Sequence, residues 1–257
     1  MGRAVDPAAV EIKMSLIKIT NAPEPDGLAN WVLRDFCGQL AGPVCAIFKA
    51  SLREGCVPSR WKAANAIPVP IEYLPRSITS DLWPIALTAT LGKILESFVG
   101  NWNLQTVENK LDGQYGGLKR WSTTHALVDI MHQWHSTVDE GQSVRAVFVD
   151  VSKAFDHTDH NILVAKIHRF GLSDIVVCWM CDFFRCRTQW VKIGDVLSDW
   201  LPITAGMPQG SFLGPLTFII LVDRMTAGDL THKYIDDTTV TALTARQPVT
   251  CNQLSII

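Results

Sequence analysis

Apolar residues in the first half of the chain recur three or four positions apart, which is the spacing of one helix face. The clearest example is the series Leu91, Ile94 and Phe98. This spacing, together with proline and glycine at segment ends, predicts helices over about residues 28–40, 43–54, 85–111 and 124–140. Residues 63–71 contain several prolines instead, which favours an extended segment at a sheet edge or in a finger-like loop.

The second half of the chain mixes strands with helices. Residues 145–151 form a short apolar run typical of a strand, and residues 160–171 behind it have helical spacing. Gly194 and Asp195 predict the turn of a β-hairpin, and residues 231–243 predict strand, tight turn and strand. Because hairpins accompany the helices, we expect an α+β fold and not a doubly wound sheet.

Composition narrows the class of protein. A chain of 257 residues with 47% hydrophobic residues can bury a substantial core. Its formal net charge of −2 lacks the basic surplus of a free-standing nucleic-acid binder, so any contact with nucleic acid must be local. The seven cysteines follow no disulfide framework, no signal peptide is visible, and the longest apolar run, at 212–222, is too short for a membrane span. We expect an intracellular protein, nuclear or cytoplasmic, that is neither secreted nor membrane-spanning.

Two adjacent aspartates, Asp236 and Asp237, lie between residues that favour strands. Aspartate is depleted in strands, and neighbouring carboxylates repel unless water or a cation offsets their charge. A third aspartate, Asp150, ends the strand predicted at 145–151 and would join them at one sheet edge if the two strands are neighbours. Spacing alone leaves two interpretations open: solvated turns, or a Mg²⁺ site built from carboxylate oxygens.

Other patterns that bear chemistry have a simpler explanation. Cys178 and Cys181 form a lone C-x-x-C in an apolar helix with no second pair, which favours core packing over a zinc site. Two histidine pairs also lack zinc-like neighbours: His132 with His135, and His157 with His160. The second pair follows the strand that bears Asp150, which leaves contact with a substrate open.

Three segments around the aspartates occur in a fixed order: FVDVSKAFDHTDH at 148–160, AGMPQGSFLGPL at 205–216 and YIDDTT at 234–239. In that order they resemble the three palm motifs of reverse transcriptases, most closely those of non-LTR retrotransposons. Upstream, PRSITSDLWPIALTATLGKILESF at 75–98 and GLKRWSTTHAL at 117–127 resemble finger segments of the same family. The resemblance implies right-hand polymerase fingers and palm, with an antiparallel palm sheet packed on helices.

The resemblance also implies how the chain is divided and what it does. Residues 1–143 would form N-terminal helices and fingers, and residues 144–257 a palm, together one reverse transcriptase domain. The chain ends soon after Asp237, so we expect the thumb to be missing. The implied activity is RNA-directed DNA synthesis: deoxynucleoside triphosphates are added to a DNA primer on an RNA template, with two Mg²⁺ ions.

The family's metal-binding roles carry over to matched positions. Asp150 would be the first metal ligand, together with the carbonyl of Val151, a residue that is also expected to contact the substrate. Asp236 would be the second carboxylate ligand, and Asp237 its catalytic neighbour. Successive side chains of a strand face opposite ways, so these last two are expected to differ in role.

Substrate-binding roles carry over in the same way. The backbone amides near Lys153 and Ala154 lie where the family holds the triphosphate. Phe155 matches the bulky residue that rejects a ribose 2′-hydroxyl and so selects deoxynucleotides. Gln209 and Gly210 would lie against the nascent base pair and the template, where glycine allows a close backbone approach.

Two positions depart from the family pattern. Ile71 stands where a lysine is usual, and Trp83 where an arginine is usual. Those two cations are expected to clamp the incoming triphosphate, so we expect a partial or degenerate retroelement copy. Two alternatives are an inactive remnant that binds nucleic acid or a protein partner, and a different metal-dependent phosphodiesterase that uses the same aspartates.

Overall fold

The computed structural model describes residues 5–20, 25–71, 74–77, 81–111, 114–117, 121–223 and 230–245. The chain forms two compact units, and each is built from two separate stretches of sequence. The first unit comprises residues 1–110 and 153–221, and the second comprises residues 111–152 and 222–257. The two units are the parts of the chain that pack most closely within themselves, whereas fingers and palm are defined by function. The boundary predicted after residue 143 therefore stays a prediction.

The first unit contains both helices and a sheet. The helices are α1 (Pro7–Ser15), α2 (Asn30–Asp35), α3 (Cys37–Glu54), α4 (Thr90–Glu108), α6 (His160–Arg169), α7 (Asp174–Phe184) and α8 (Leu213–Val222), with a 3₁₀ turn at Ser59–Lys62. Their apolar faces enclose a core that contains Phe48, Trp179 and Phe184, all fully buried. The indole Nε1 of Trp179 donates to the Ser51 hydroxyl over 3.0 Å, so its polar atom has a partner inside the core.

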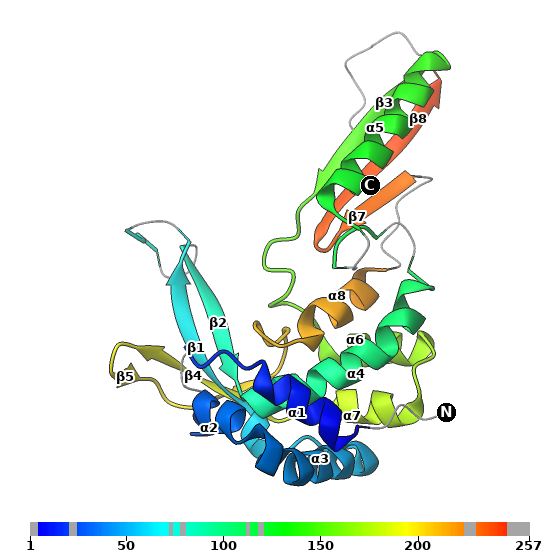
Figure 1. Ribbon diagram of the computed structural model, residues 1–257. Coiled ribbons are helices and arrows are strands. Elements are labelled where there is room, and N and C mark those ends of the chain that lie inside the picture. Colours follow the sequence, from blue (N-terminus) through cyan, green and yellow to red (C-terminus); the bar gives the residue numbers. More distant parts are fainter. Residues whose placement is uncertain are drawn as a thin grey trace. The chain divides into compact units, whose positions relative to one another are not determined.

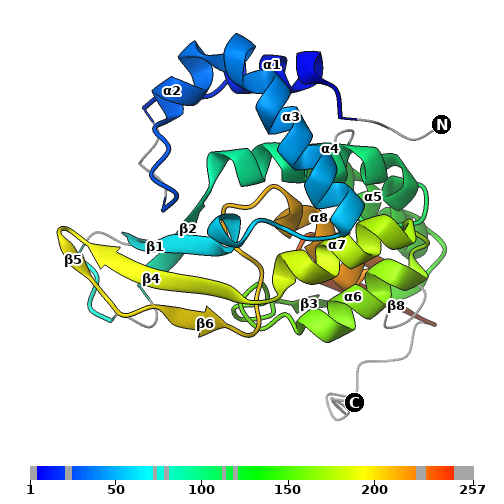
Figure 2. The same ribbon diagram turned by 90° about the horizontal axis from the view of Figure 1, so that it is seen from below.

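The sheet of the first unit joins strands from both of its stretches. The strands are β1 (Ala63–Pro70), β2 (Leu82–Thr88), β4 (Arg187–Ile193), β5 (Val196–Leu197) and β6 (Leu201–Ile203). Their order is β2-β1-β4-β5, with β6 also paired to β4. The pairing of β1 with β4 is parallel and the other pairings are antiparallel, and Figure 2 shows β1, β2 and β4 side by side.

The prediction of an extended segment over residues 63–71 is confirmed by β1, but its first half, Ala63–Ala66, is not at a sheet edge, because it has a neighbour on each side. The parallel partner β4 reaches only from Ala63 to Ala66, whereas β2 pairs along the whole of β1. Pro68 and Pro70 therefore lie beyond β4, where one side of the strand needs no donor. The prolines thus lie in the half of β1 that has β2 alone as its neighbour.

Two helix boundaries also differ from the prediction. Pro43 lies inside α3 and does not begin a new helix, while the break predicted there falls at Phe36, between α2 and α3. Residues 85–88, expected in a helix, belong to β2, and α4 begins only at Thr90. The stop expected at Gly55 is confirmed: this residue caps α3 in the left-handed conformation, with φ of 64°.

The second unit is a three-stranded antiparallel sheet covered by one helix (Figure 1). Its elements are α5 (Thr123–Asp139), β3 (Gln142–Val149), β7 (Leu230–Tyr234) and β8 (Asp237–Ala245). The strand order is β3-β8-β7, and α5 packs on β3 and β7. The hairpin predicted over 231–243 is confirmed, and the mixture of helices with mainly antiparallel strands agrees with the α+β prediction.

No helix in the described parts of the chain combines the length and the apolar character that crossing a membrane requires.

Candidate active site

The sheet of the second unit brings the three predicted aspartates to one end of neighbouring strands. Val149, the last residue of β3, pairs with Thr238 of β8, so Asp150 follows level with Asp237. Asp236 lies in the two-residue turn that joins β7 to β8, next to the terminal pair Tyr234–Asp237. The condition set by the sequence, that the two aspartate-bearing strands are neighbours, is therefore met.

The aspartates differ in their surroundings. Asp236 is half-buried, whereas Asp150 and Asp237 are exposed. Within the described ranges, no three histidine, cysteine, aspartate or glutamate side chains approach one another closely enough to hold a metal ion. The strands thus align the three residues without gathering their carboxylates into one cluster, as expected for like charges that repel across water.

The donor atoms at this end of the sheet still suit magnesium. Two carboxylates, from Asp150 and Asp236, and the backbone carbonyl of Val151 are all hard oxygen donors. Mg²⁺ commonly takes only one or two protein carboxylates and completes its shell with water and substrate phosphates. An exposed strand end with few carboxylates suits a Mg²⁺ ion that keeps water and phosphate ligands better than it suits an ion enclosed by protein ligands alone.

A hydrogen-bonded cluster supports β7 just before the turn. The Asp129 carboxylate on α5 accepts from the Tyr115 hydroxyl over 2.6 Å and lies 2.9 Å from Nε2 of His232 on β7. The hydrogen bond from Tyr115 is the main reason why the pKa of Asp129 lies below its usual range. Sequence reasoning missed this cluster, because its members are far apart in the chain and form no motif.

Apart from Val151, which belongs to the second unit, the predicted substrate-binding residues belong to the first unit, where two loops are hydrogen-bonded to each other. The Met207 amide donates to the Phe155 carbonyl over 2.8 Å, and the Gly206 amide donates to the Thr158 carbonyl over 2.8 Å. Lys153 begins the first loop in the left-handed region, with φ of 52°. The loop at 153–158 and the loop at 205–209 therefore form one double-loop structure.

The Phe155 ring stacks on Phe218 of α8, with centroids 4.1 Å apart and planes at 14°. This contact fixes the orientation of the ring, which is half-buried. A rigid aromatic wall is what a steric gate requires. The role of Phe155 as a gate, and that of the amides of Lys153 and Ala154, stay predictions.

Gln209 and Gly210 lie where the second loop contacts β2. The Gln209 side chain donates to Asp156 over 3.0 Å, and its carbonyl accepts from the Ala86 amide over 2.9 Å. Gly210 has φ of 100°, and a Cβ there would lie 2.7 Å from the Ala86 carbonyl oxygen. The close approach expected of this glycine is thus made to β2, beside a cavity of about 260 Å³ that Gln209 and Asp156 help to line.

Gly210→Ala is expected to lower the free energy of unfolding by about 1–2 kcal/mol, because alanine resists this φ and collides with the Ala86 carbonyl. Urea unfolding followed by fluorescence measures the change. Gly42→Ala is the control, since that helical glycine has no heavy atom near its missing Cβ and alanine favours a helix. Equal stability of the Gly210→Ala chain and the unaltered chain would contradict the expected strain.

A buried acid anchors the helix that follows this loop. The Glu96 carboxylate of α4 accepts from the amides of Phe212 and Leu213, at 2.8 and 3.3 Å, at the start of α8. Burial raises the pKa of Glu96 to about 7, although the nearby guanidinium of Arg187 opposes the shift. Burial also lowers the pKa of Arg187 to about 10. The available signal in the sequence was a glutamate among the apolar residues of a predicted helix.

Comparison with known sequences decides the family. The sequence model of reverse transcriptases (RNA-dependent DNA polymerases) matches residues 76–254, which is more than half of the chain. The chain belongs to the reverse transcriptase family. The match includes all three palm segments on which the resemblance rested.

Several reverse transcriptase relatives are mobile-element proteins. The chain is 24% identical over 238 residues to the probable RNA-directed DNA polymerase from transposon BS of Drosophila melanogaster, a match that covers 90% of this chain and 26% of that protein. It is 27% identical over 221 residues to the polymerase from mobile element jockey of the same species, covering 84% and 24%. A third is the Pol polyprotein of the type-1 retrotransposable element R1 of Bradysia coprophila, 27% identical over 243 residues and covering 87% and 22%. The chain spans about a quarter of the length of these curated relatives.

The two positions that depart from the reverse transcriptase pattern lie together at the end of the β1–β2 hairpin. Trp83 pairs with Val69, and the Ile71 amide donates to the Asp81 carbonyl one step beyond the last strand pair. Because strand residues alternate between faces, Ile71 and Trp83 are diagonal neighbours on one face. Their side chains are 58% and 51% exposed. The register thus places two exposed apolar side chains next to each other at this end of the hairpin.

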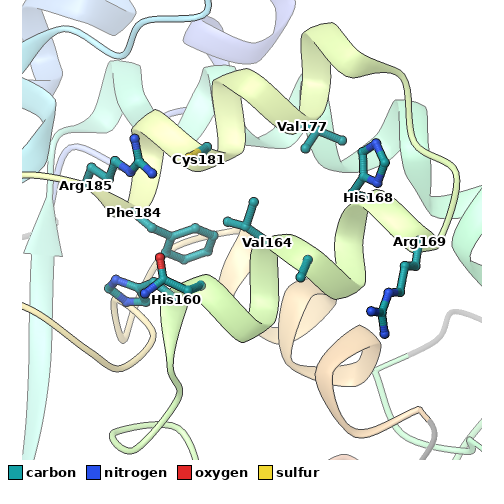
Figure 3. Close-up of a pocket in the computed structure, with 10 residues that line it drawn as sticks. His160, Val164, His168, Arg169, Val177, Cys181, Phe184 and Arg185 are labelled. Carbon is teal, nitrogen blue, oxygen red and sulfur yellow. The ribbon is translucent and has the colours of Figure 1, made fainter.

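The cysteine and histidine pairs do not form a metal site within the described residues. Cys178 is exposed, so the prediction that it packs in the core was wrong, whereas Cys181 is half-buried. Cys181 and His160 line a cavity of about 410 Å³ between α6 and α7. Figure 3 shows these two side chains among the residues that line it. His160 contacts the Gly206 carbonyl through Nε2 at 2.7 Å, so it helps to hold the double loop.

Proposed function

We propose that this chain is the polymerase domain of a non-LTR retrotransposon reverse transcriptase, which extends a DNA primer on an RNA template with deoxynucleoside triphosphates. The observation that carries the proposal is the register of β3 with β8, which aligns Asp150 with the Asp236–Asp237 turn. Family membership and the order of the three palm segments support it. We place this activity inside the cell, in the nucleus or cytoplasm.

Each proposed residue has a distinct task in this reaction. Asp150, Asp236 and the Val151 carbonyl would hold two Mg²⁺ ions, which supply charge stabilisation to the attacking and leaving oxygens when bound. Asp237, exposed at the first position of β8, would act beside them on the primer side. The amides near Lys153 and Ala154 would bind the triphosphate, and Gln209 with Gly210 would support the nascent base pair.

Phe155 would decide which sugar is accepted. An aromatic wall rejects a 2′-hydroxyl by its volume and by leaving that hydroxyl without a hydrogen-bond partner. The stacking of Phe155 on Phe218 supports this role, because the ring cannot swing aside without losing a buried aromatic contact.

A second candidate function is a descendant of the same fold that binds nucleic acid or a protein partner without synthesis. The observation that favours it is the pair of exposed apolar side chains, Ile71 and Trp83, at the hairpin positions where the family carries cations. A triphosphate held without those cations would be positioned less firmly.

The test is Mg²⁺-dependent primer extension on an RNA template. Asp236→Asn is expected to lower extension at least about a hundredfold, because it removes a charge needed in the transition state while keeping the size of the side chain. The matched control is Asp195→Asn, which makes the same change in the exposed turn of the β4–β5 hairpin and should retain full extension.

Binding of the RNA template, measured by fluorescence anisotropy, separates the two candidates. Extension that depends on Asp236 supports the polymerase. RNA binding without extension in the unaltered chain supports the non-catalytic descendant. Extension that survives Asp236→Asn would refute the proposed role of the hairpin.

A further inference from the structure

The turn that carries Asp236 is strained at the residue before it. Ile235 has φ of 60°, a conformation in which a β-branched side chain is a clear outlier. Two-residue hairpin turns require positive φ and usually place glycine, asparagine or aspartate there. An isoleucine at this position persists only where neighbouring structure holds the turn in place.

A short segment, Gln114–Gly116, lies directly against this hairpin. Gln114 forms a parallel bridge with Lys233 of β7, and the Tyr115 amide donates to the Lys233 carbonyl over 2.8 Å. The Gln114 side chain donates to the Gly116 carbonyl over 2.9 Å, which fixes the shape of the segment. The 114–116 segment therefore continues the sheet beyond β7, up to the turn.

Gly116 makes the closest approach to the strained residue. A Cβ at Gly116 would lie 2.6 Å from Cγ1 of Ile235 and 2.7 Å from its backbone nitrogen. The φ of Gly116 is outside the positive region that favours glycine. The reason for glycine at this position is space for the turn and not backbone freedom.

The 114–116 segment is anchored at its other side to α5. The Tyr115 hydroxyl donates to Asp129, and the Tyr115 ring stacks on His232 of β7 at 5.8 Å between centroids. The Asp129 carboxylate also contacts Nε2 of His232 over 2.9 Å. Tyr115 thus ties the segment to the helix and to the strand, so the turn presses against a fixed surface.

We infer that the 114–116 segment positions the turn of the proposed catalytic hairpin, with Gly116 as the positioning residue that seats Ile235 and so places Asp236. The inference rests on the proposed function and extends it to a segment outside the three palm motifs. A displacement of about 1 Å at a reacting group can lower a rate about a hundredfold. A single methyl group added at Gly116 could therefore lower the rate measurably by displacing the turn.

The experiment compares Gly116→Ala with Gly141→Ala. Gly141 lies between α5 and β3 in the same unit, has φ of 77°, and has no heavy atom near its missing Cβ. Alanine at Gly141 strains the backbone outside the β7–β8 hairpin. This variant therefore controls for the effect of a general loss of stability. We expect Gly116→Ala to lower kcat ten- to a hundredfold with KM for the nucleotide changed less than threefold, and Gly141→Ala to leave kcat unchanged.

A second measurement does not depend on activity. Hydrogen exchange of the peptide that spans residues 230–240 should become at least tenfold faster in Gly116→Ala than in Gly141→Ala. Adding Ile235→Gly to Gly116→Ala removes the side-chain collision and the strained φ of Ile235, while the close approach to the backbone nitrogen remains, so it should restore slow exchange in part. Tyr115→Phe, which adds no volume, should shift exchange in the same direction and serves if Gly116→Ala does not fold.

The outcomes separate the inference from the proposed function. A fall in kcat with faster local exchange supports both. If the unaltered chain shows no polymerase activity, the proposed function fails, and the exchange comparison alone decides the inference. Equal exchange in Gly116→Ala and Gly141→Ala, with kcat unchanged where it can be measured, would overturn it.

Discussion

The double substitution Ile71→Lys with Trp83→Arg is expected to raise kcat/KM for a deoxynucleoside triphosphate about a hundredfold. The two positions are diagonal neighbours on one face of the β1–β2 hairpin, and both side chains are exposed. Cations placed there can approach one polyanionic ligand together, and such clamps supply a large part of catalysis in phosphoryl transfer. Steady-state primer extension at varied nucleotide concentration measures the change, and each single substitution should give a smaller gain.

The matched control for added charge is Ile193→Lys with Val196→Arg. These two residues pair with each other on the neighbouring β4–β5 hairpin and are also exposed. The control adds the same two charges, so it reports any general gain in binding to nucleic acid. An equal rise in both double variants would show that charge and not position is responsible, and the clamp hypothesis would be wrong.

Glu96→Gln is expected to remove part of the dependence of stability on pH. In the folded chain the pKa of Glu96 is raised to about 7 from its ordinary value of 4.5, so the folded state binds this proton more tightly than the unfolded state does. The resulting stabilisation is present in acid and is lost as pH rises through about 7. Between about pH 5 and pH 8 this loss amounts to about 2–3 kcal/mol.

Urea unfolding of both chains across that pH range measures the effect. Glutamine keeps an oxygen that can accept from the amides of Phe212 and Leu213, so α8 remains anchored. The difference in stability between the two chains should therefore change by about 2–3 kcal/mol from pH 5 to pH 8. Glu11→Gln, on the exposed side of α1, should follow the unaltered chain. Parallel curves for Glu96→Gln and the unaltered chain would contradict the role of burial.

Local patterns predicted several elements correctly and failed where distant partners decide. The hairpin β7–β8 followed from strand-forming residues on both sides of a short polar turn, and the end of α3 followed from Gly55. The place of β1 inside its sheet did not, because β4 lies more than a hundred residues away in the sequence. The apolar run at residues 85–88 is compatible with a helix or a strand until its pairing with β1 is known.

The same contrast holds at the candidate site. Asp150 was recognised because it belongs to a motif and follows a predictable strand, and the Asp236–Asp237 pair because it belongs to a motif at a predictable hairpin turn. Glu96 and Asp129 were missed, since their importance comes from burial and from partners on other elements. Gly116 was missed for the same reason: its proposed role depends on the close approach to Ile235, which no sequence spacing predicts.

The two units alternate along the sequence, and this order affects how the chain folds during translation. The two stretches of the first unit are separated in the sequence by residues 111–152, which belong to the second unit. The two stretches of the second unit are separated by residues 153–221, which belong to the first. When β3 emerges during translation, its partner β8 has not been made, and β1 must likewise wait for β4. Long-range pairing of this kind delays folding and leaves strand edges open meanwhile. Asp150 can align with Asp236 and Asp237 only after nearly the whole described chain has been synthesised. A chain whose synthesis stops within residues 153–221 would therefore leave both units incomplete.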